Sequence, residues 1–300
     1  MNILKQFDGS IDQSGKTLLL DHHVGVGDCL WRSSLHREIK RRNPNMKLIV
    51  SSMGNYWKLM FKDSPYIDEL RDKIGGNLDL RGVDYAVSDQ KCVHVISSFA
   101  RELDALDSLE IWAGFKIRDK SYYYKVTEEE SKCADSFLSK YERPLIGIQL
   151  KSSTWVRTPK VSETIRLIRM LRFNGFNVIV LDNGGFGFTD EGVINLASGY
   201  NVREVAAIIQ KLDLMVAPDS GLLHFAGHFK IPTIALFGGS DPQCRLKYYD
   251  TVYPIYSGKN GCKEWPCWIH AHACQFGIPA PCLEVITADI VFDKVKQILG

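Results

Sequence analysis

The stretch Asp213–Pro242 (DLMVAPDSGLLHFAGHFKIPTIALFGGSDP) constrains the fold of this chain more than any other. Apolar runs at Leu214–Ala217 and Thr233–Phe237 predict two strands, and the residues between them, Leu222–Phe229, predict a helix. A strand, helix and strand this close together form a βαβ unit with parallel strands. Both polar turns of the stretch then lie at carboxyl ends of strands, where open α/β sheets bind ligands. The sequence therefore predicts an α/β fold with a ligand site at this edge.

The first of these turns combines a carboxylate, a hydroxyl and a glycine at the start of the helix, in Asp219, Ser220 and Gly221. The uncapped N–H groups and the dipole of a helix start favour a phosphate. His224 follows one turn later on the same face. Asp and Ser are also preferred helix caps, and taken alone the turn favours that structural interpretation. A second polar turn at the same edge, Gly238–Pro242, shifts the balance towards a ligand site.

A similar unit opens the chain. A strand at Thr17–His22 runs through Gly25 and Gly27 into a helix expected at Asp28–Arg42. The two glycines are expected to let the backbone turn tightly and approach a ligand without a side chain in the way. Asp28 is expected at the helix N-cap, so capping alone explains it as well as a reactive role does.

The remaining pattern predicts strands and helices in alternation along the whole chain. Further strands are expected at Lys47–Ser51, Val83–Val87, Val93–Ser97, Leu145–Leu150 and Asn177–Leu181. Helices are expected at Tyr56–Phe61, Phe99–Phe115, Thr127–Tyr141, Ser162–Asn174, Asp190–Leu196, Val202–Leu212 and Thr287–Leu299.

A length of 300 residues exceeds the usual size of a single core, which predicts two domains. The helical pattern breaks at Tyr141–Pro144 and the strand pattern then restarts, so we expect domains at residues 1–143 and 144–300. Two α/β domains that face each other across a cleft are the architecture this implies.

Composition narrows the function classes. A net charge of +2 gives no electrostatic reason to expect nucleic acid or an anionic membrane as a partner. The sequence has no apolar run near twenty residues, and its first residues lack the pattern of a secretion signal. We therefore expect a cytoplasmic protein without a transmembrane segment, whose oligomeric state the sequence leaves open.

Four of the eight cysteines fall close together near the C-terminus. The cluster, within residues 262–282 of the second domain, consists of Cys262, Cys267, Cys274 and Cys282, with His270 and His272 among them. Four such ligands could form a structural zinc site, although the spacing is looser than in paired C-x2-C motifs. Reduced, buried cysteines are the alternative, and a reducing cytoplasm disfavours disulfides.

Taken together, these motifs resemble the heptosyltransferase family of glycosyltransferases (family 9). The likeness rests on Gly25–Asp28, on Arg157–Pro159 after a central strand, and most of all on Asp219–Pro242. In order and spacing it covers most of the chain from Thr17 to Thr287. The resemblance implies the GT-B fold, with two Rossmann-like domains facing a central cleft and a C-terminal helix that packs back on the first domain.

The resemblance also implies an inverting transfer of a sugar from a nucleotide diphosphate sugar to an acceptor hydroxyl, without a metal at the reaction centre. Asp28 matches the family's catalytic base, in the domain that binds the acceptor. The donor-binding positions of the second domain correspond to Lys151, Ser152, Thr154, Arg157, Lys160, Asp219, Ser220, Gly221 and His224. Such chemistry needs a base for the acceptor hydroxyl and positive or N–H groups for the departing diphosphate.

The sequence departs from the family at two points. A glutamate that meets the ribose is absent from residues 182–187, where Asp182 could serve instead, and Thr158 replaces a common tryptophan. Neither a heptose donor nor a lipopolysaccharide acceptor is therefore assumed; the acceptor could be a saccharide, a lipid-linked glycan or a modified nucleobase.

Two other function classes remain to be weighed. A non-catalytic nucleotide-sugar-binding protein would use Asp28 only as a helix cap. A dinucleotide-dependent oxidoreductase is disfavoured, because Leu30 stands where the third glycine of that fingerprint belongs.

Overall fold

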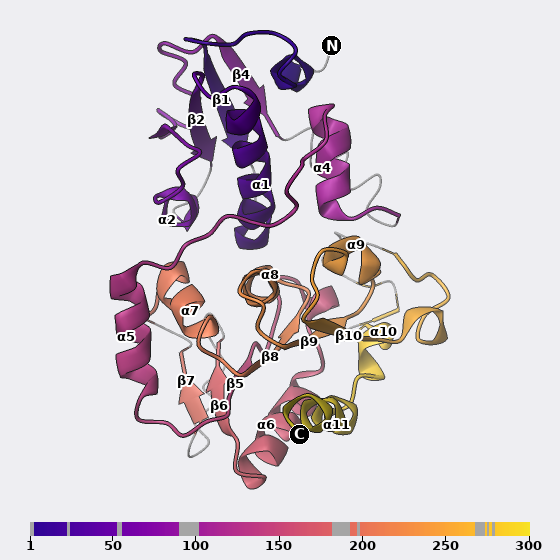
Figure 1. The fold of residues 1–300 in the computed structure, drawn as a ribbon. Helices are drawn as coiled ribbons and strands as arrows, with labels where there is room; N and C mark the ends of the chain where they lie inside the picture. Colours follow the sequence, from indigo (N-terminus) through magenta and orange to yellow (C-terminus); the bar gives the residue numbers. More distant parts are fainter. Residues whose placement is uncertain are drawn as a thin grey trace. The chain divides into compact units, whose positions relative to one another are not determined.

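The computed structural model describes residues 3–22, 25–52, 56–89, 102–181, 193–196, 199–267, 274, 276–277 and 280–300. The chain divides into two compact units, Met1–Lys125 and Val126–Gly300. The division falls earlier than the expected boundary after residue 143, because helix α5 (Glu128–Leu138) packs on α7 (Val202–Ile209). Figure 1 shows α5 beside α7. The buried Arg203 of α7 donates from Nη2 to Oε2 of Glu130 at 2.8 Å, which holds α5 on the second unit.

In the described residues, the first unit is built on a four-stranded parallel sheet in the order β3-β2-β1-β4. Its strands are β1 (Thr17–His22), β2 (Lys47–Ser52), β3 (Glu69–Leu70) and β4 (Tyr85–Ser88). Its helices are η1 (Ile3–Phe7), α1 (Val26–Arg42), α2 (Tyr56–Phe61) and α4 (Ala105–Ala113). The central strand β1 is buried at every residue, as expected for a strand covered on both faces.

The second unit carries a six-stranded parallel sheet, counted over the same residues, in the order β10-β9-β8-β5-β6-β7. Its strands are β5 (Leu145–Ile148), β6 (Asn177–Val180), β7 (Val193–Asn195), β8 (Leu214–Pro218), β9 (Thr233–Phe237) and β10 (Val252–Tyr256). Its remaining helices are η2 (Trp155–Arg157), α6 (Val161–Phe173), α8 (Gly221–His228), α9 (Gln243–Leu246), η3 (Gly258–Asn260), α10 (Pro281–Glu284) and α11 (Ala288–Leu299). The strand order runs outward in both directions from β5 and β8, so the switch point of the sheet lies between these two strands.

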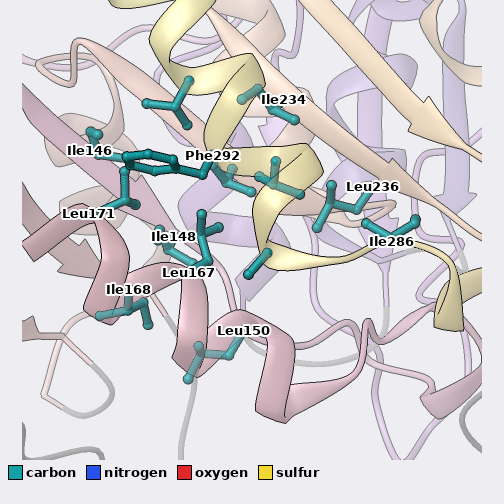
Figure 2. Packing of buried hydrophobic residues seen from close by; sticks show 14 of the residues in the cluster. Ile146, Ile148, Leu150, Leu167, Ile168, Leu171, Ile234, Leu236, Ile286 and Phe292 are labelled. Atoms are coloured by element: carbon teal, nitrogen blue, oxygen red, sulfur yellow. The ribbon is translucent and has the colours of Figure 1, made fainter. Parts of the chain in front are cut away.

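The core of the second unit includes the C-terminal helix. Apolar residues of β5, α6 and β9 pack against α11, and Figure 2 shows Phe292 of that helix among Ile146 and Leu171. Arg166 of α6 pairs with Asp289 of α11 at 2.7 Å on the outside of this contact. The apolar face of α11 is thus buried within the second unit.

Several element boundaries differ from the sequence-based expectation. The expected helix at 190–196 gives way, where it is described, to strand β7, parallel to β6. The expected helix at 99–115 is described from Ala105, because the Asp104 carboxylate accepts the Leu106 N–H at 2.8 Å and so caps the helix there. The strand expected at 93–97 lies outside the described residues. Among the helices that the structure describes, none has the length and apolar character needed to cross a membrane.

Candidate functional site

The loop after β5 is attached to the turn after β8, at the switch point of the second sheet. The backbone carbonyl of Asp219 accepts hydrogen bonds from Arg157 Nη1 at 3.0 Å and from Ser152 Oγ at 3.1 Å. Both donors come from the loop that follows β5. The structure therefore brings these three sequence-predicted residues together at the edge where α/β sheets bind ligands.

The Asp219 side chain points into the protein rather than towards solvent. It is 3% exposed, and its Oδ2 accepts the Ser240 hydroxyl at 3.1 Å. Ser240 belongs to the glycine-rich turn after β9, so Asp219 joins the loops that follow β5, β8 and β9. The Arg157 guanidinium approaches the same carboxylate oxygen at 3.9 Å. Asp219 therefore shapes the site, and its carboxylate is held by the protein.

The helix that starts at this turn, α8, has no capping hydrogen bond from the side chain of its N-cap residue, Ser220. The Ser220 hydroxyl donates to Oε1 of Gln149 instead. The first N–H groups of a helix lack intrahelical partners, and the helix dipole makes them attractive to an anion. This turn has the properties of a phosphate site.

Arg157 is held by its own loop as well as by Asp219. Its Nε donates to Thr154 Oγ1 and its Nη2 to Ser153 Oγ, both at 3.0 Å, and its side chain remains 30% exposed. The Thr158 hydroxyl accepts the Ser152 N–H at 3.2 Å. The loop is thus rigid, with the guanidinium fixed at the rim of the α8 N-terminus.

His224 lies on α8 and is 3% exposed. Its Nδ1 is 2.8 Å from the Tyr249 hydroxyl, which fixes the orientation of the imidazole. The Tyr249 ring lies against Gly227, where a Cβ would come within 2.5 Å of Cε1 of Tyr249. Sequence reasoning missed Tyr249, because it lies in no motif and its role depends on packing against the glycine at position 227.

Three other predicted donor residues are less well defined by the structure. Lys160 is exposed at the N-cap position of α6, and Lys151 is half-buried at the start of its loop. Asp182 lies outside the described residues.

Asp28, in the first unit, is placed differently from the expectation. Helix α1 begins at Val26 with Gly25 as its N-cap, so Asp28 is the third helical residue. Its Oδ2 accepts the Gly25 N–H at 3.0 Å, and its side chain is 39% exposed. The expected tight glycine turn is corrected: Gly25 has an ordinary φ of −81° and Gly27 is helical. A Cβ at Gly25 would meet the Asp28 carboxylate at 3.3 Å. The absence of a side chain at Gly25 therefore leaves room for this carboxylate beside the backbone.

The cysteine-rich segment is anchored to the turn after β9. The Trp265 Nε1–H donates to the Gly238 carbonyl at 3.0 Å, and the Cys267 N–H donates to the Gly239 carbonyl at 2.9 Å. Burial raises the pKa of the Cys282 thiol to about 11, and the other three cysteines of the cluster add to the rise.

Cys282 belongs to the buried core of the second unit, and Cys262 and Cys274 pack against that core. Within the described ranges, however, no three His, Cys, Asp or Glu side chains are arranged to hold a metal ion. His270 and His272 lie outside those ranges.

The sequence comparisons match part of the second unit, whereas the fold comparisons cover nearly the whole chain. The sequence profile of glycosyltransferase family 9 (heptosyltransferase) matches residues 186–264. The lipopolysaccharide core heptosyltransferase OpsX of Haemophilus influenzae is 34% identical over 73 residues, which are 24% of this chain and 21% of that protein. The matched stretch thus spans about a fifth of the curated relative.

Two solved structures resemble the fold along nearly the whole chain. E. coli ADP-heptose lipopolysaccharide heptosyltransferase II is 17% identical with a TM-score of 0.72, covering 94% of this chain and 98% of that one. The iron-containing dodecameric glycosyltransferase TibC from enterotoxigenic E. coli is 15% identical with a TM-score of 0.71, covering 97% and 79%. The predicted α/β, GT-B fold class is confirmed. Residues 186–264 are therefore similar in sequence to glycosyltransferase family 9, and the fold of the chain resembles that of solved heptosyltransferases.

Proposed function

We propose that this protein is an inverting glycosyltransferase that moves a sugar from a nucleotide diphosphate sugar to an acceptor hydroxyl. The observation that carries the proposal is the N-terminus of α8, which has no capping hydrogen bond from the Ser220 side chain and lies at the switch point of the second sheet. A diphosphate is the group for which such a helix start is suited. The family profile matches the same part of the chain.

The second unit would bind the donor. The first N–H groups of α8, around Gly221, would bind the diphosphate, and Arg157 would add a positive charge from the rim. The proposed donor site is completed by residues on the loop after β5 or next to it, which are Lys151, Ser152, Thr154 and Lys160. Asp182 would meet the ribose. This arrangement stabilises the charge that develops on the diphosphate as it leaves.

The first unit would supply the base. In a single displacement, the acceptor oxygen forms a bond to the anomeric carbon while the bond from that carbon to the diphosphate breaks, which inverts the configuration. The acceptor proton passes to the Asp28 carboxylate as the new bond forms. The exposure of this carboxylate supports the assignment, because a buried one could not reach an acceptor. No metal is needed in any of these steps.

The relatives suggest the first donor to test. TibC has been solved in complex with ADP-D-β-D-heptose and is 16% identical to this chain, so an ADP-sugar is the leading candidate. OpsX is named for the lipopolysaccharide core, which makes a saccharide the leading acceptor class. The proposed setting is the cytoplasm, where a reducing environment disfavours disulfides.

A panel of ADP-, GDP-, UDP- and CMP-sugars tests the proposal directly. A donor at a hundred times its dissociation constant adds about 2.7 kcal/mol to the free energy of unfolding, which a thermal melt detects. We expect one nucleotide class to shift the melting temperature and the matching sugar to appear on an acceptor. If none of the four classes shifts the melt, the donor site proposed at α8 is wrong.

A structural metal in the cysteine segment is a separate, secondary proposal. Four thiols supply suitable ligands for zinc or iron, and TibC is described as iron-containing. Elemental analysis of the purified protein decides the question, since less than about a tenth of an equivalent of either metal rules out a stoichiometric site.

The chief alternative is a nucleotide-sugar-binding protein without catalysis. The capping contact between Asp28 and the Gly25 N–H is the observation that favours it, because it gives this carboxylate a structural reason to be present. A binding protein without catalysis would show the same rise in melting temperature with the nucleotide sugar but would form no glycoside.

A further inference from the structure

A continuous set of buried polar side chains extends inward from Asp28 in the first unit. Arg32 follows Asp28 by one helical turn, on the same face of α1, and its side chain is 1% exposed. Its Nε donates to Oδ2 of Asp89 at 3.0 Å, and the Asp89 side chain is also 1% exposed. Asp89 directly follows β4, at the carboxyl end of the sheet.

Two histidines complete the set. The same Asp89 oxygen lies 2.8 Å from His22 Nδ1, and His22 Nε2 lies 2.8 Å from His36 Nε2. A carboxylate can only accept, so His22 Nδ1 carries a proton. Burial, followed by electrostatic interactions with His22 and Arg32, lowers the pKa of His36 well below its usual value, so His36 is neutral near pH 7. The hydrogen bond between His22 Nε2 and His36 Nε2 then requires a proton on only one of these two nitrogens.

The Asp89 carboxylate is therefore held from two directions, by a guanidinium and by an imidazole. Buried charges of this kind are costly, and a well-packed apolar cluster would often be as stable. The arrangement does, however, leave the Arg32 guanidinium little freedom, because Asp89 fixes it at Nε.

The outer end of the set is the Asp28 carboxylate. Arg32 Nη1 lies 3.9 Å from Oδ1 of Asp28, while Oδ2 accepts the Gly25 N–H at 3.0 Å. The two oxygens thus have different surroundings: one is tied to the helix start and the other faces a fixed positive charge. These two contacts together restrict the rotation of the Asp28 side chain.

We propose that Arg32 is a positioning residue for Asp28, held in place by Asp89 and the His22–His36 pair. Arg32 is too deeply buried to touch an acceptor, and it acts by fixing the direction in which the Asp28 carboxylate faces. The inference rests on the proposed function, in which Asp28 takes the acceptor proton.

The kinetic test uses Arg32→Lys, which keeps the charge but replaces the planar fork by a single ammonium that cannot serve both carboxylates. We expect kcat to fall about tenfold while the KM for the donor changes less than about twofold. The matched control is Arg203→Lys, since Arg203 is also buried and is paired with Glu130, which is not one of the residues assigned to the site. That control is expected to keep kcat within about twofold. An Arg32→Lys enzyme with unchanged kcat overturns the proposal.

If Arg32→Lys is too unstable to assay, Asp89→Asn takes its place. This substitution keeps the shape of the side chain but removes the charge that holds Arg32. The same split between kcat and KM is expected, and an unchanged kcat again contradicts the proposal.

A second measurement does not depend on sugar transfer. A double-mutant cycle of Asp28→Asn and Arg32→Lys, followed by equilibrium unfolding, reports whether the two side chains interact. Coupling that changes the unfolding equilibrium constant by about twofold or more supports the contact, and strict additivity rejects it. If the wild type transfers no sugar but the cycle shows coupling, the proposed function fails while the Asp28–Arg32 contact stands. If transfer is normal and the cycle is additive, only the positioning role fails.

Discussion

At the scale of single residues, Asp28 illustrates how a reactive group and a structural group can be the same side chain. Its Oδ2 completes the first turn of α1 through the Gly25 N–H, and its exposure leaves it accessible to an acceptor. A substitution that removes both properties at once cannot separate them. The informative change is one that keeps the acceptor atom and removes only the basicity.

Asp28→Asn is that change, because the amide oxygen can still accept the Gly25 N–H. We expect glycosyl transfer to fall by about 10²–10⁴-fold, the usual contribution of a general base, with nucleotide affinity unchanged. Asp28→Ala serves as the comparison and should lose, in addition, about 0.5–2 kcal/mol of stability with the cap. Normal turnover by Asp28→Asn would reject the assignment of Asp28 as the general base.

Tyr249 gives a second residue-scale prediction. Tyr249→Phe keeps the ring that packs on Gly227 but removes the hydroxyl that meets His224 Nδ1. We expect nucleotide binding to weaken by an amount equivalent to about 0.5–1.5 kcal/mol, because His224 loses its fixed orientation. Titration calorimetry measures this change. Binding as tight as that of the wild type would show that the imidazole has no part in the donor site.

The sequence points to candidate site residues more readily than to the contacts among them. The turn at Asp219 and Ser220 is recognisable because its residue types suit a helix start. The inward direction of the Asp219 carboxylate is not, because its partner Ser240 comes from another loop. Likewise, no local pattern connects Arg32 with Asp89, which lies more than fifty residues further along the chain. Long-range hydrogen bonds of this kind follow from strand order, which a single sequence does not reveal.

At the scale of elements, the contact between α5 and α7 joins the start of the second unit to its body. Burial disfavours the charged form of Glu130, but hydrogen bonds from Arg203 and from the Thr127 N–H outweigh it and lower the pKa of Glu130 to about 2. In an unfolded chain, where these contacts are absent, the ordinary pKa of a glutamate carboxyl group is 4.5. A group whose pKa is lowered by folding stabilises the folded state above its unfolded pKa, and this stability is lost as the pH falls towards the folded pKa.

Acid unfolding should therefore depend on Glu130. We expect the second unit to lose about 3 kcal/mol between pH 4.5 and pH 2 through this group. Glu130→Gln keeps an oxygen for the Thr127 N–H but should be less stable near pH 7 and show a flatter stability profile across this window. Urea unfolding at a series of pH values measures the free energy of unfolding of both proteins. If the two plots of free energy against pH run parallel, the ion pair does not couple to folding.

Two elements show why the secondary structure could be predicted only in part. Strand β10 contains Pro254, which argues against a strand in the middle of a sheet, yet β10 lies at the end of the strand order, where a proline is tolerated. In β7, Val193 and Ile194 are β-branched and pair with β6, which outweighs the helical pattern of their neighbours. In both cases the position of the segment in the sheet decides its structure.

At the scale of the whole molecule, the division after Lys125 has a practical consequence. The second unit contains its own first helix, α5, and its own C-terminal helix, α11, both packed within it. A fragment of residues 126–300 should therefore fold alone, whereas a fragment cut at the sequence-based boundary after 143 would lose α5 and expose the face of α7 that α5 covers.

The two fragments make a matched pair. We expect 126–300 to unfold cooperatively and to bind the same nucleotide as the full chain, without transferring sugar, because Asp28 is absent. The fragment 144–300 should be less stable or insoluble. Circular dichroism melts and nucleotide titration compare them. Equal stability of the two would mean that α5 contributes little to the second unit.

The hydrogen bonds that Asp219 accepts also determine which mutations can alter the turn after β8. Two of its hydrogen bonds end on a backbone carbonyl, which every amino acid supplies, so no substitution at position 219 can abolish them directly. The bond from Ser240 and the approach of the Arg157 guanidinium do depend on the side chain. Mutations that change the shape of this turn should therefore occur at the hydrogen-bond donors, Ser152 and Arg157. A laboratory selection for use of another nucleotide sugar should likewise yield more substitutions at these two residues than at Asp219.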